Sequence, residues 1–311
     1  MAVPAQARFD PRVWADEWPN TDFSVHSVDL AEIRSGGPPK DGIPALDDPA
    51  FIAVADETRL GDREPVMVVE ITGETPKAYP VRYLTWHEIV NDRIGAIPLS
   101  VTFCPLCNSG LIFDRRIDDR VLSFGVSGKL RNSDMVMYDR ETESWWQQFT
   151  GEAIVGALTG TTLTRIPGWM ESWSDFRTRN ADGLVMDEPR HPRPYGANPY
   201  LGYDTSLSPF LYGGEDPPHD IPSLARVIVV GDRAWPLTRV RASGEIREDG
   251  LLITWKEGTA SALDTRTIAD GRDVGSIRVR DAGTGYDVAH DVAFAFAFHA
   301  FFPEGTWMIG N

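Results

Sequence analysis

The sequence predicts a mainly β protein with a few short helices, of the α+β class. Its apolar segments are short and rich in valine, isoleucine and aromatic residues, which is the pattern of β-strands. Between them, 28 glycines and 23 prolines leave few windows long enough for an extended helix. With 42% apolar and 24% charged residues, the 311-residue chain has the composition of a globular protein with a sizeable core.

The expected strands are short segments bounded by turn-forming residues. They are residues 51–55, 66–71, 98–103, 110–117, 120–126, 134–139, 226–231, 251–255 and 276–280. Two further segments carry apolar residues at helical spacing, and helices are therefore expected over residues 81–92 and 171–180.

Two segments resemble one another, VMVVEITGETPKAYPVRYL (66–84) and RVIVVGDRAWPLTRV (226–240). Each has an apolar β run, a turn that contains glycine, a basic-Ala-aromatic-Pro unit and a return to apolar residues. This similarity raises the hypothesis of an internally duplicated β-hairpin unit. Coincidence is the alternative, because glycine turns between valine-rich strands are common.

We expect a single mainly β domain over residues 35–311, preceded by an N-terminal extension over residues 1–34. Within the domain, residues 186–222 carry so many prolines and glycines that a long ordered loop is expected there.

The formal charge of −16 argues against nucleic acid and anionic membranes as partners, because an acidic surface repels phosphate. No apolar run reaches the length of a membrane span, and the N-terminus has neither a basic leader nor an apolar core. We therefore expect a cytoplasmic protein. In that compartment its thiols stay reduced, which makes a structural disulfide the less expected use of a cysteine pair.

Both cysteines of the chain, Cys104 and Cys107, lie in the stretch VTFCPLCNSGLIFD (101–114), between two expected strands. Four interpretations compete. Free cysteines are often small buried apolar residues. A C-x-x-C pair can also exchange electrons with thiols, although such a pair normally opens a helix, and here a strand is expected to follow.

Zinc is the third interpretation, because C-P-x-C is half of a zinc ribbon, but zinc needs two further ligands from histidines or carboxylates. Copper(I) is the fourth, and it is satisfied by two or three soft ligands. We expect Cys104 and Cys107 to be metal ligands, with His87 as third ligand or supporting partner. Met135 and Met137 share one face of an expected strand and are more simply read as core residues.

The segment GVSGKLRNSDMVMYD (125–139) is expected to contribute a polar loop beside the sulfurs. Small residues there allow close backbone approach, and several polar groups follow within a few positions. A solvated hairpin turn would have a similar composition. The expected substrate-binding residues are Ser127, Lys129, Arg131, Asn132 and Asp134, with Lys129 and Arg131 suited to hold a carboxylate.

Five segments of the chain resemble, in order, the signature blocks of a bacterial and archaeal family known as domain of unknown function 3179. They are SGGPPKDGIPALDDPAF (35–51), KAYPVRYLTWHEIVND (77–92), VTFCPLCNSGLIFDRR (101–116), FGVSGKLRNSDMVMYDRETESWWQQFTGEAIVGALTG (124–160) and FHAFFPEG (298–305). The resemblance implies no reaction, because the family is uncharacterised. The chain departs from it at Asn108, where many relatives have a small residue such as glycine, and it lacks the export or lipid-anchor features of many members.

The sequence thus predicts a thiolate-based copper(I)-binding protein, acting as an oxidoreductase that uses O2 or another redox reaction with Cys104 and Cys107 as catalytic residues. Two alternatives stay open. One is a thiol-disulfide oxidoreductase that uses the same pair, and the other is a non-catalytic zinc-binding or structural protein. The expected partner is a small-molecule or thiol-containing substrate.

Overall fold

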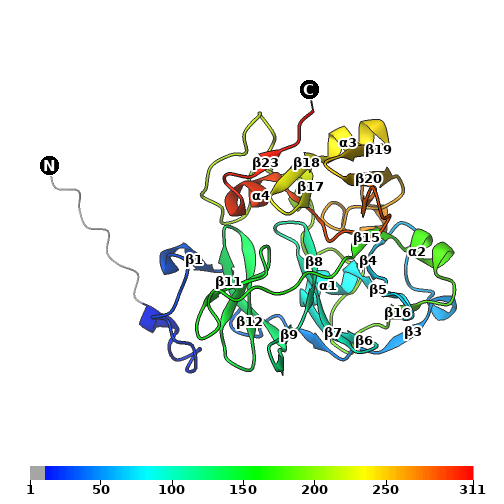
Figure 1. The fold of residues 1–311 in the computed structure, drawn as a ribbon. Coiled ribbons are helices and arrows are strands. Elements are labelled where there is room, and N and C mark those ends of the chain that lie inside the picture. The colour runs from blue at the N-terminus through cyan, green and yellow to red at the C-terminus, as the bar shows by residue number, and fades with distance from the viewer. Residues whose placement is uncertain (1–10, 311) are drawn as a thin grey trace.

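The computed structural model describes residues 11–310 and confirms the mainly β class. Within those residues the strands form five larger sheets and one two-stranded ribbon. The larger sheets follow one another around the molecule and resemble the blades of a five-bladed β-propeller (Figure 1). We name each sheet by one of its central strands.

Three sheets lie in the N-terminal two thirds of the chain. The β11 sheet has the order β1 (Ile33–Ser35), β11 (Phe124–Arg131), β12 (Asp134–Asp139), β13 (Trp145–Gln147) and β14 (Glu152–Val155). The β7 sheet has the order β2 (Leu46–Asp47), β6 (Ile89–Ile94), β7 (Ile97–Cys104) and β8 (Ser109–Asp114). The β4 sheet has the order β15 (Trp169–Ser172), β4 (Pro65–Val69), β5 (Lys77–Pro80), β16 (Leu184–Met186) and β3 (Phe51–Ala53).

The C-terminal third forms the other two sheets. The β17 sheet has the order β22 (Asp291–Phe294), β17 (Arg226–Val230), β18 (Arg233–Pro236) and β23 (Thr306–Trp307). The β20 sheet has the order β19 (Glu245–Glu248), β20 (Leu251–Lys256) and β21 (Ser276–Asp281), and the ribbon pairs β9 (Arg116–Ile117) with β10 (Arg120–Val121).

Each α-helix of the described residues spans seven residues and directly follows a strand. The helices are α1 (Val81–His87), α2 (Trp173–Arg179), α3 (Leu237–Ser243) and α4 (Ala295–Phe301). The helix expected over residues 171–180 is α2. The helix expected over residues 81–92 is too long, because Glu88 takes a φ of +60° and ends α1, and the residues after it form β6.

The two similar sequence segments fold alike. Residues 66–84 contain the β4–β5 hairpin followed by α1, and residues 226–240 contain the β17–β18 hairpin followed by α3. The residue that precedes each helix is a proline, Pro80 or Pro236. Over the described residues the five larger sheets resemble the blades of a propeller, which is not the architecture that a duplicated hairpin predicts. The similarity is therefore local to these two hairpin–helix units.

No strands are expected in the proline-rich segment 186–222 or in the N-terminal segment, and the structure differs between these two segments. Between the end of β16 at Met186 and the start of β17, the proline-rich chain forms only the short 3-10 turn Tyr203–Thr205. Of the N-terminal extension expected over residues 1–34, residues 1–10 lie outside the described residues. Residues 11–34 pack on the β11 sheet, since β1 pairs with β11. Trp18 there is 1% exposed, with its ring 4.8 Å from Tyr138 and 5.1 Å from Trp145.

Among the described residues, no helix combines the length and the apolar character that crossing a membrane requires.

Replacing Trp18 by alanine should test whether the N-terminal segment belongs to the fold. Because the side chain is buried between two aromatic rings, Trp18→Ala should lower the free energy of unfolding by about 3–5 kcal/mol in chemical denaturation. Val13→Ala is the matched control, since Val13 is 70% exposed in the same segment. Equal unfolding midpoints for the two variants would show that residues 11–35 contribute no stability.

Candidate functional site

The two cysteines lie on a tight turn between neighbouring antiparallel strands. β7 ends at Cys104 and β8 begins at Ser109, and these two residues are paired. Within the turn, the Cys107 amide donates to the Cys104 carbonyl over 3.2 Å, and the Asn108 amide donates to the Pro105 carbonyl over 3.2 Å. The strand that follows is the one expected from the sequence, so no helix begins at the second cysteine.

The departure at Asn108 has a structural reason. Its φ is +52°, in the left-handed region that glycine and asparagine tolerate best. Asparagine therefore meets the same backbone requirement as the glycine expected in relatives. Its side chain also donates to the Val292 carbonyl over 2.6 Å, which ties the turn to β22.

β22 holds the turn from one side by further hydrogen bonds. The Phe294 amide donates to the Cys107 carbonyl over 2.8 Å. Asp291 accepts from the Ser109 hydroxyl over 2.6 Å and from the Gly110 amide over 2.9 Å. Burial raises the pKa of Asp291 to about 6, although these donors favour its charged form. The sulfurs are thus fixed by strands distant in sequence.

Asp134 completes a compact group with the two cysteines. One ligand atom from each of Cys104, Cys107 and Asp134 lies within 4.8 Å of the other two, and all three residues are buried. Asp134 Oδ2 accepts from the Gln147 amide group over 2.6 Å and from the Phe149 backbone amide over 2.9 Å. No N–H or O–H group of the described residues donates to its Oδ1, and the neighbouring thiols of Cys104 and Cys107 favour the charged form of the carboxyl. Two sulfurs and a carboxylate oxygen could therefore converge on one cation.

Burial makes all three acidic groups of this site harder to ionise. Burial raises the pKa of the Cys104 thiol, and it raises that of Cys107 well above its ordinary value. Burial also raises the pKa of Asp134 to about 6. Three adjacent acids away from water cannot all ionise on their own, whereas a metal ion stabilises the deprotonated forms.

The expected polar loop is shorter than predicted. β11 continues to Arg131, and only Asn132 and Ser133 connect it to β12, both with positive φ of 50° and 63°. This two-residue connection matches the backbone preference of a tight hairpin. The polar residues before this connection belong to β11 and not to a loop. The strand was not recognised this far because a bulge between Val126 and Lys129 interrupts its alternating pattern.

The five expected substrate-binding residues are largely engaged elsewhere. The Ser127 hydroxyl donates to the Val136 carbonyl. Lys129 Nζ lies 2.7 Å from Glu17 Oε2, and Arg131 Nε lies 2.7 Å from Glu32 Oε2, so both cations have carboxylate partners in the N-terminal segment.

Asn132 is a turn residue, and of the five only Asp134 is grouped with the sulfurs.

His87 is bound by other groups on both sides of its ring. Its Nδ1 lies 2.6 Å from the Pro44 carbonyl oxygen, to which it donates, and its Nε2 then accepts from the Tyr195 hydroxyl over 2.7 Å. Burial lowers the pKa of His87 to about 4, which keeps the ring neutral. The structure does not group His87 with the sulfurs, and the third group whose ligand atom lies near them is the Asp134 carboxyl.

A cleft of about 830 Å³ opens beside the cysteine turn. Leu106, which lies between the two cysteines, and Met135, which follows Asp134, both line it. The Tyr203 hydroxyl donates to the Leu106 carbonyl over 3.0 Å and connects the proline-rich segment to the turn. A small molecule in this cleft would lie next to the residues that carry the sulfurs.

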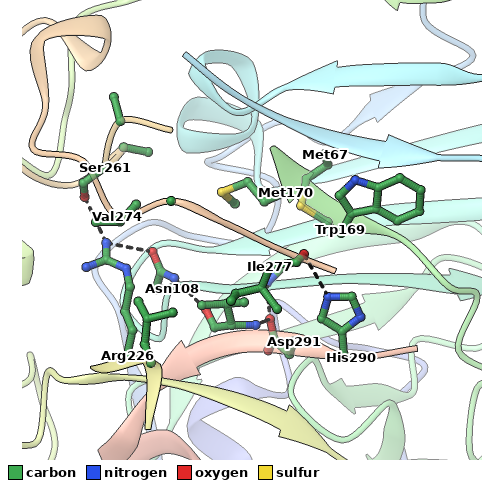
Figure 2. Close-up of a pocket in the computed structure, with 16 residues that line it drawn as sticks. Met67, Asn108, Trp169, Met170, Arg226, Ser261, Val274, Ile277, His290 and Asp291 are labelled. Atoms are coloured by element: carbon green, nitrogen blue, oxygen red, sulfur yellow. Dashed lines mark hydrogen bonds between the residues drawn. The ribbon is translucent and has the colours of Figure 1, made fainter. Parts of the chain in front are cut away.

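A second, much smaller cavity of about 40 Å³ borders Asn108 and Asp291. Figure 2 shows Arg226 reaching Ser261 and Asn108 there. The Arg226 guanidinium also pairs with buried Asp204 over 3.0 Å. A cavity of this size holds on the order of one or two water molecules, so we assign it a structural role in bracing the turn.

Sequence reasoning missed two groups at the cleft, Glu88 and Tyr200. The Tyr200 hydroxyl donates to Glu88 Oε1 over 3.3 Å. Burial raises the pKa of Glu88 to about 7. The only sequence signal for Glu88 is its place directly after His87 in the H-E-I-V-N-D run (87–92), where the histidine is the more obvious candidate for a functional residue.

The raised pKa of Glu88 predicts a pH-dependent loss of stability. The folded protein binds this proton more tightly than the unfolded chain, so the stabilising effect is complete below the ordinary pKa of 4.5 and is lost as the pH rises through about 7. Glu88→Gln should remove the loss. The variant should be more stable than the parent at pH 8 by on the order of 2 kcal/mol, and similar to it near pH 4.

Urea denaturation across this range is the measurement. Glu215→Gln, at an exposed position, is the control and should follow the parent at every pH. A constant difference between Glu88→Gln and the parent from pH 4 to 8 would contradict the assignment.

The comparisons with known proteins assign the chain no activity. A family model described as "Protein of unknown function (DUF3179)" matches residues 40–305, which is most of the chain. No curated protein and no solved structure matches.

Proposed function

We propose a function from the geometry of the site, because the chain belongs to the DUF3179 family and the description of that family names no reaction. The proposal is that the protein binds copper(I) through Cys104 and Cys107. The observation that carries the proposal is the buried group of two sulfurs and the Asp134 carboxyl, whose ligand atoms all lie within 4.8 Å of one another. Two thiols and a carboxyl this close together are a set of donors that a metal ion could bind in their deprotonated forms.

Copper(I) agrees with the number and softness of the donors. Two thiolates suffice for copper(I), and the third donor available is a carboxylate that can stay at a longer distance. The thioether of Met135 packs in the same core cluster as both sulfurs and adds a soft neighbour.

Zinc is the second candidate, and the Asp134 oxygen is the observation that favours it. Zinc accepts sulfur and carboxylate ligands but needs a fourth donor, which in an open site is water or substrate. The cleft beside Leu106 offers room for such a donor.

Thiol-disulfide exchange is less well supported. A reactive pair of this kind has an accessible thiol with a lowered pKa, usually at a helix N-terminus. Here Cys104 and Cys107 are 2% and 0% exposed, burial raises both thiol pKa values, and a strand follows.

We further propose that the copper site serves an oxidoreductase. A substrate in the adjacent cleft would give two electrons and two protons to O2, which would leave as hydrogen peroxide. The cleft supports an enzyme over a closed metal carrier, because a carrier has no need of a substrate-sized space beside its ligands.

Metal content tests the binding proposal. Untagged protein should contain about one copper per chain after reconstitution with copper(I), and Cys104→Ala or Cys107→Ala should abolish binding because a single thiolate is insufficient. Asp134→Asn should retain copper with reduced affinity.

His87→Gln is the control and should keep its copper, since both ring nitrogens are engaged by Pro44 and Tyr195. One zinc per chain, dependent on Asp134, would replace the proposal by the zinc site. Protein that binds neither metal would refute both.

Oxygen consumption tests the enzymatic proposal. Copper-loaded protein should take up O2 and form an equal amount of hydrogen peroxide when a small-molecule library contains its substrate, and the Cys104→Ala variant should not. A protein that holds copper tightly and shows no uptake with any reductant of this size would be a carrier.

A further inference from the structure

The cleft beside the cysteine turn contains a buried carboxyl without a cationic partner. Glu88 is 8% exposed and lines the cleft. Its Oε1 accepts one hydrogen bond, from the Tyr200 hydroxyl, and its Oε2 takes no hydrogen bond or ion pair among residues 11–310. Buried carboxylates are normally paired, because removing the charge from water is expensive.

The one positively charged side chain among the described cleft residues already has a partner. This is Lys129, whose Nζ lies 2.7 Å from Glu17 Oε2 and is directed to the N-terminal segment. The neighbouring Arg131 is paired with Glu32 and packs over the Phe301 ring. The cleft therefore offers no free cation for an anionic ligand, which argues against the carboxylate substrate expected from the sequence.

Most of the remaining wall is apolar or aromatic, and Ser206 and Ser208 are its polar exceptions. Ile43, Leu106, Val126 and Met135 line the cleft together with Phe210. The rings of Tyr200 and Tyr203 stand in the same wall, and their hydroxyls are bonded to Glu88 and to the Leu106 carbonyl. Tyrosine rings attract a cation placed over their faces. Such a wall favours a ligand with an apolar body and a single cationic group.

We propose that the cleft binds an apolar organic amine whose ammonium group pairs with the carboxylate of Glu88. The ammonium supplies the charge that this carboxylate lacks, and the hydrocarbon body covers the apolar wall next to Leu106. That this amine is the substrate of the copper centre rests on the proposed function. Its binding does not, since Glu88 belongs to neither the sulfur pair nor the Asp134 carboxyl.

Three probes of equal size separate charge from shape. They are 4-phenylbutylamine, 4-phenylbutan-1-ol and 4-phenylbutyrate, titrated calorimetrically into metal-free protein at neutral pH. The amine should bind at least about 10-fold more tightly than the alcohol, and the carboxylate should bind most weakly, because desolvating an unmatched charge is unfavourable. Glu88→Gln should reduce amine affinity by about 10-fold or more and leave alcohol affinity nearly unchanged.

Glu215→Gln removes an equal charge at an exposed position and should leave amine binding unaltered. Equal affinity for the three probes, no amine binding, or amine binding that survives Glu88→Gln would overturn the proposal. If the Glu88→Gln variant does not fold, the relative affinities of the parent protein for the amine, the alcohol and the carboxylate still test the proposal.

Repeating the titration with copper-loaded protein separates the two proposals. Amine binding by protein that takes up no copper refutes the copper site alone. Copper binding without amine selectivity refutes this inference alone.

Discussion

Two thiols and a carboxyl are buried side by side, and the surrounding structure is arranged to keep them there. The turn that carries Cys104 and Cys107 is held by strand pairing on one side and by β22 on the other, through the bond from the Phe294 amide to the Cys107 carbonyl. Asp134 is held by Gln147 and Phe149. Because burial disfavours the charge of every member, the proposed cation would stabilise the deprotonated forms of all three groups.

The cleft next to this group depends on the same framework. Leu106 belongs to the cysteine turn and Met135 to the strand that begins with Asp134, so the residues that place the metal donors also form a wall of the cleft. The proline-rich segment supplies Tyr200 and Tyr203, which close the opposite side and bond to Glu88 and Leu106. The proposed metal site and the cleft therefore share the cysteine turn.

Much of the fold could be predicted from local pattern, because strands of alternating or continuous apolar residues are recognisable in short windows. The failures have specific causes. The helix expected to reach residue 92 ends at His87, since Glu88 adopts a positive φ. The local sequence pattern does not predict this backbone conformation. The helix α4 has the sequence AFAFHAF, whose alternation of alanine and phenylalanine is as typical of a strand.

The site was predictable only where it is local. Both cysteines were expected between two strands, and the structure has them there, between β7 and β8. Asp134 was named as a substrate-binding residue, and its place beside the sulfurs depends on the packing of two different sheets. The partners of Lys129 and Arg131 lie in the N-terminal segment, about a hundred residues away, so their neutralisation could not be read from spacing.

X-ray absorption at the metal edge of copper-loaded protein tests the central claim most directly, because it reports the atoms bound to the ion. The account predicts two sulfur neighbours per copper at about 2.3 Å, close to other metal–thiolate distances, and no bound copper when either cysteine is replaced. A first shell of nitrogen and oxygen atoms alone, unchanged by the loss of Cys104, would contradict it.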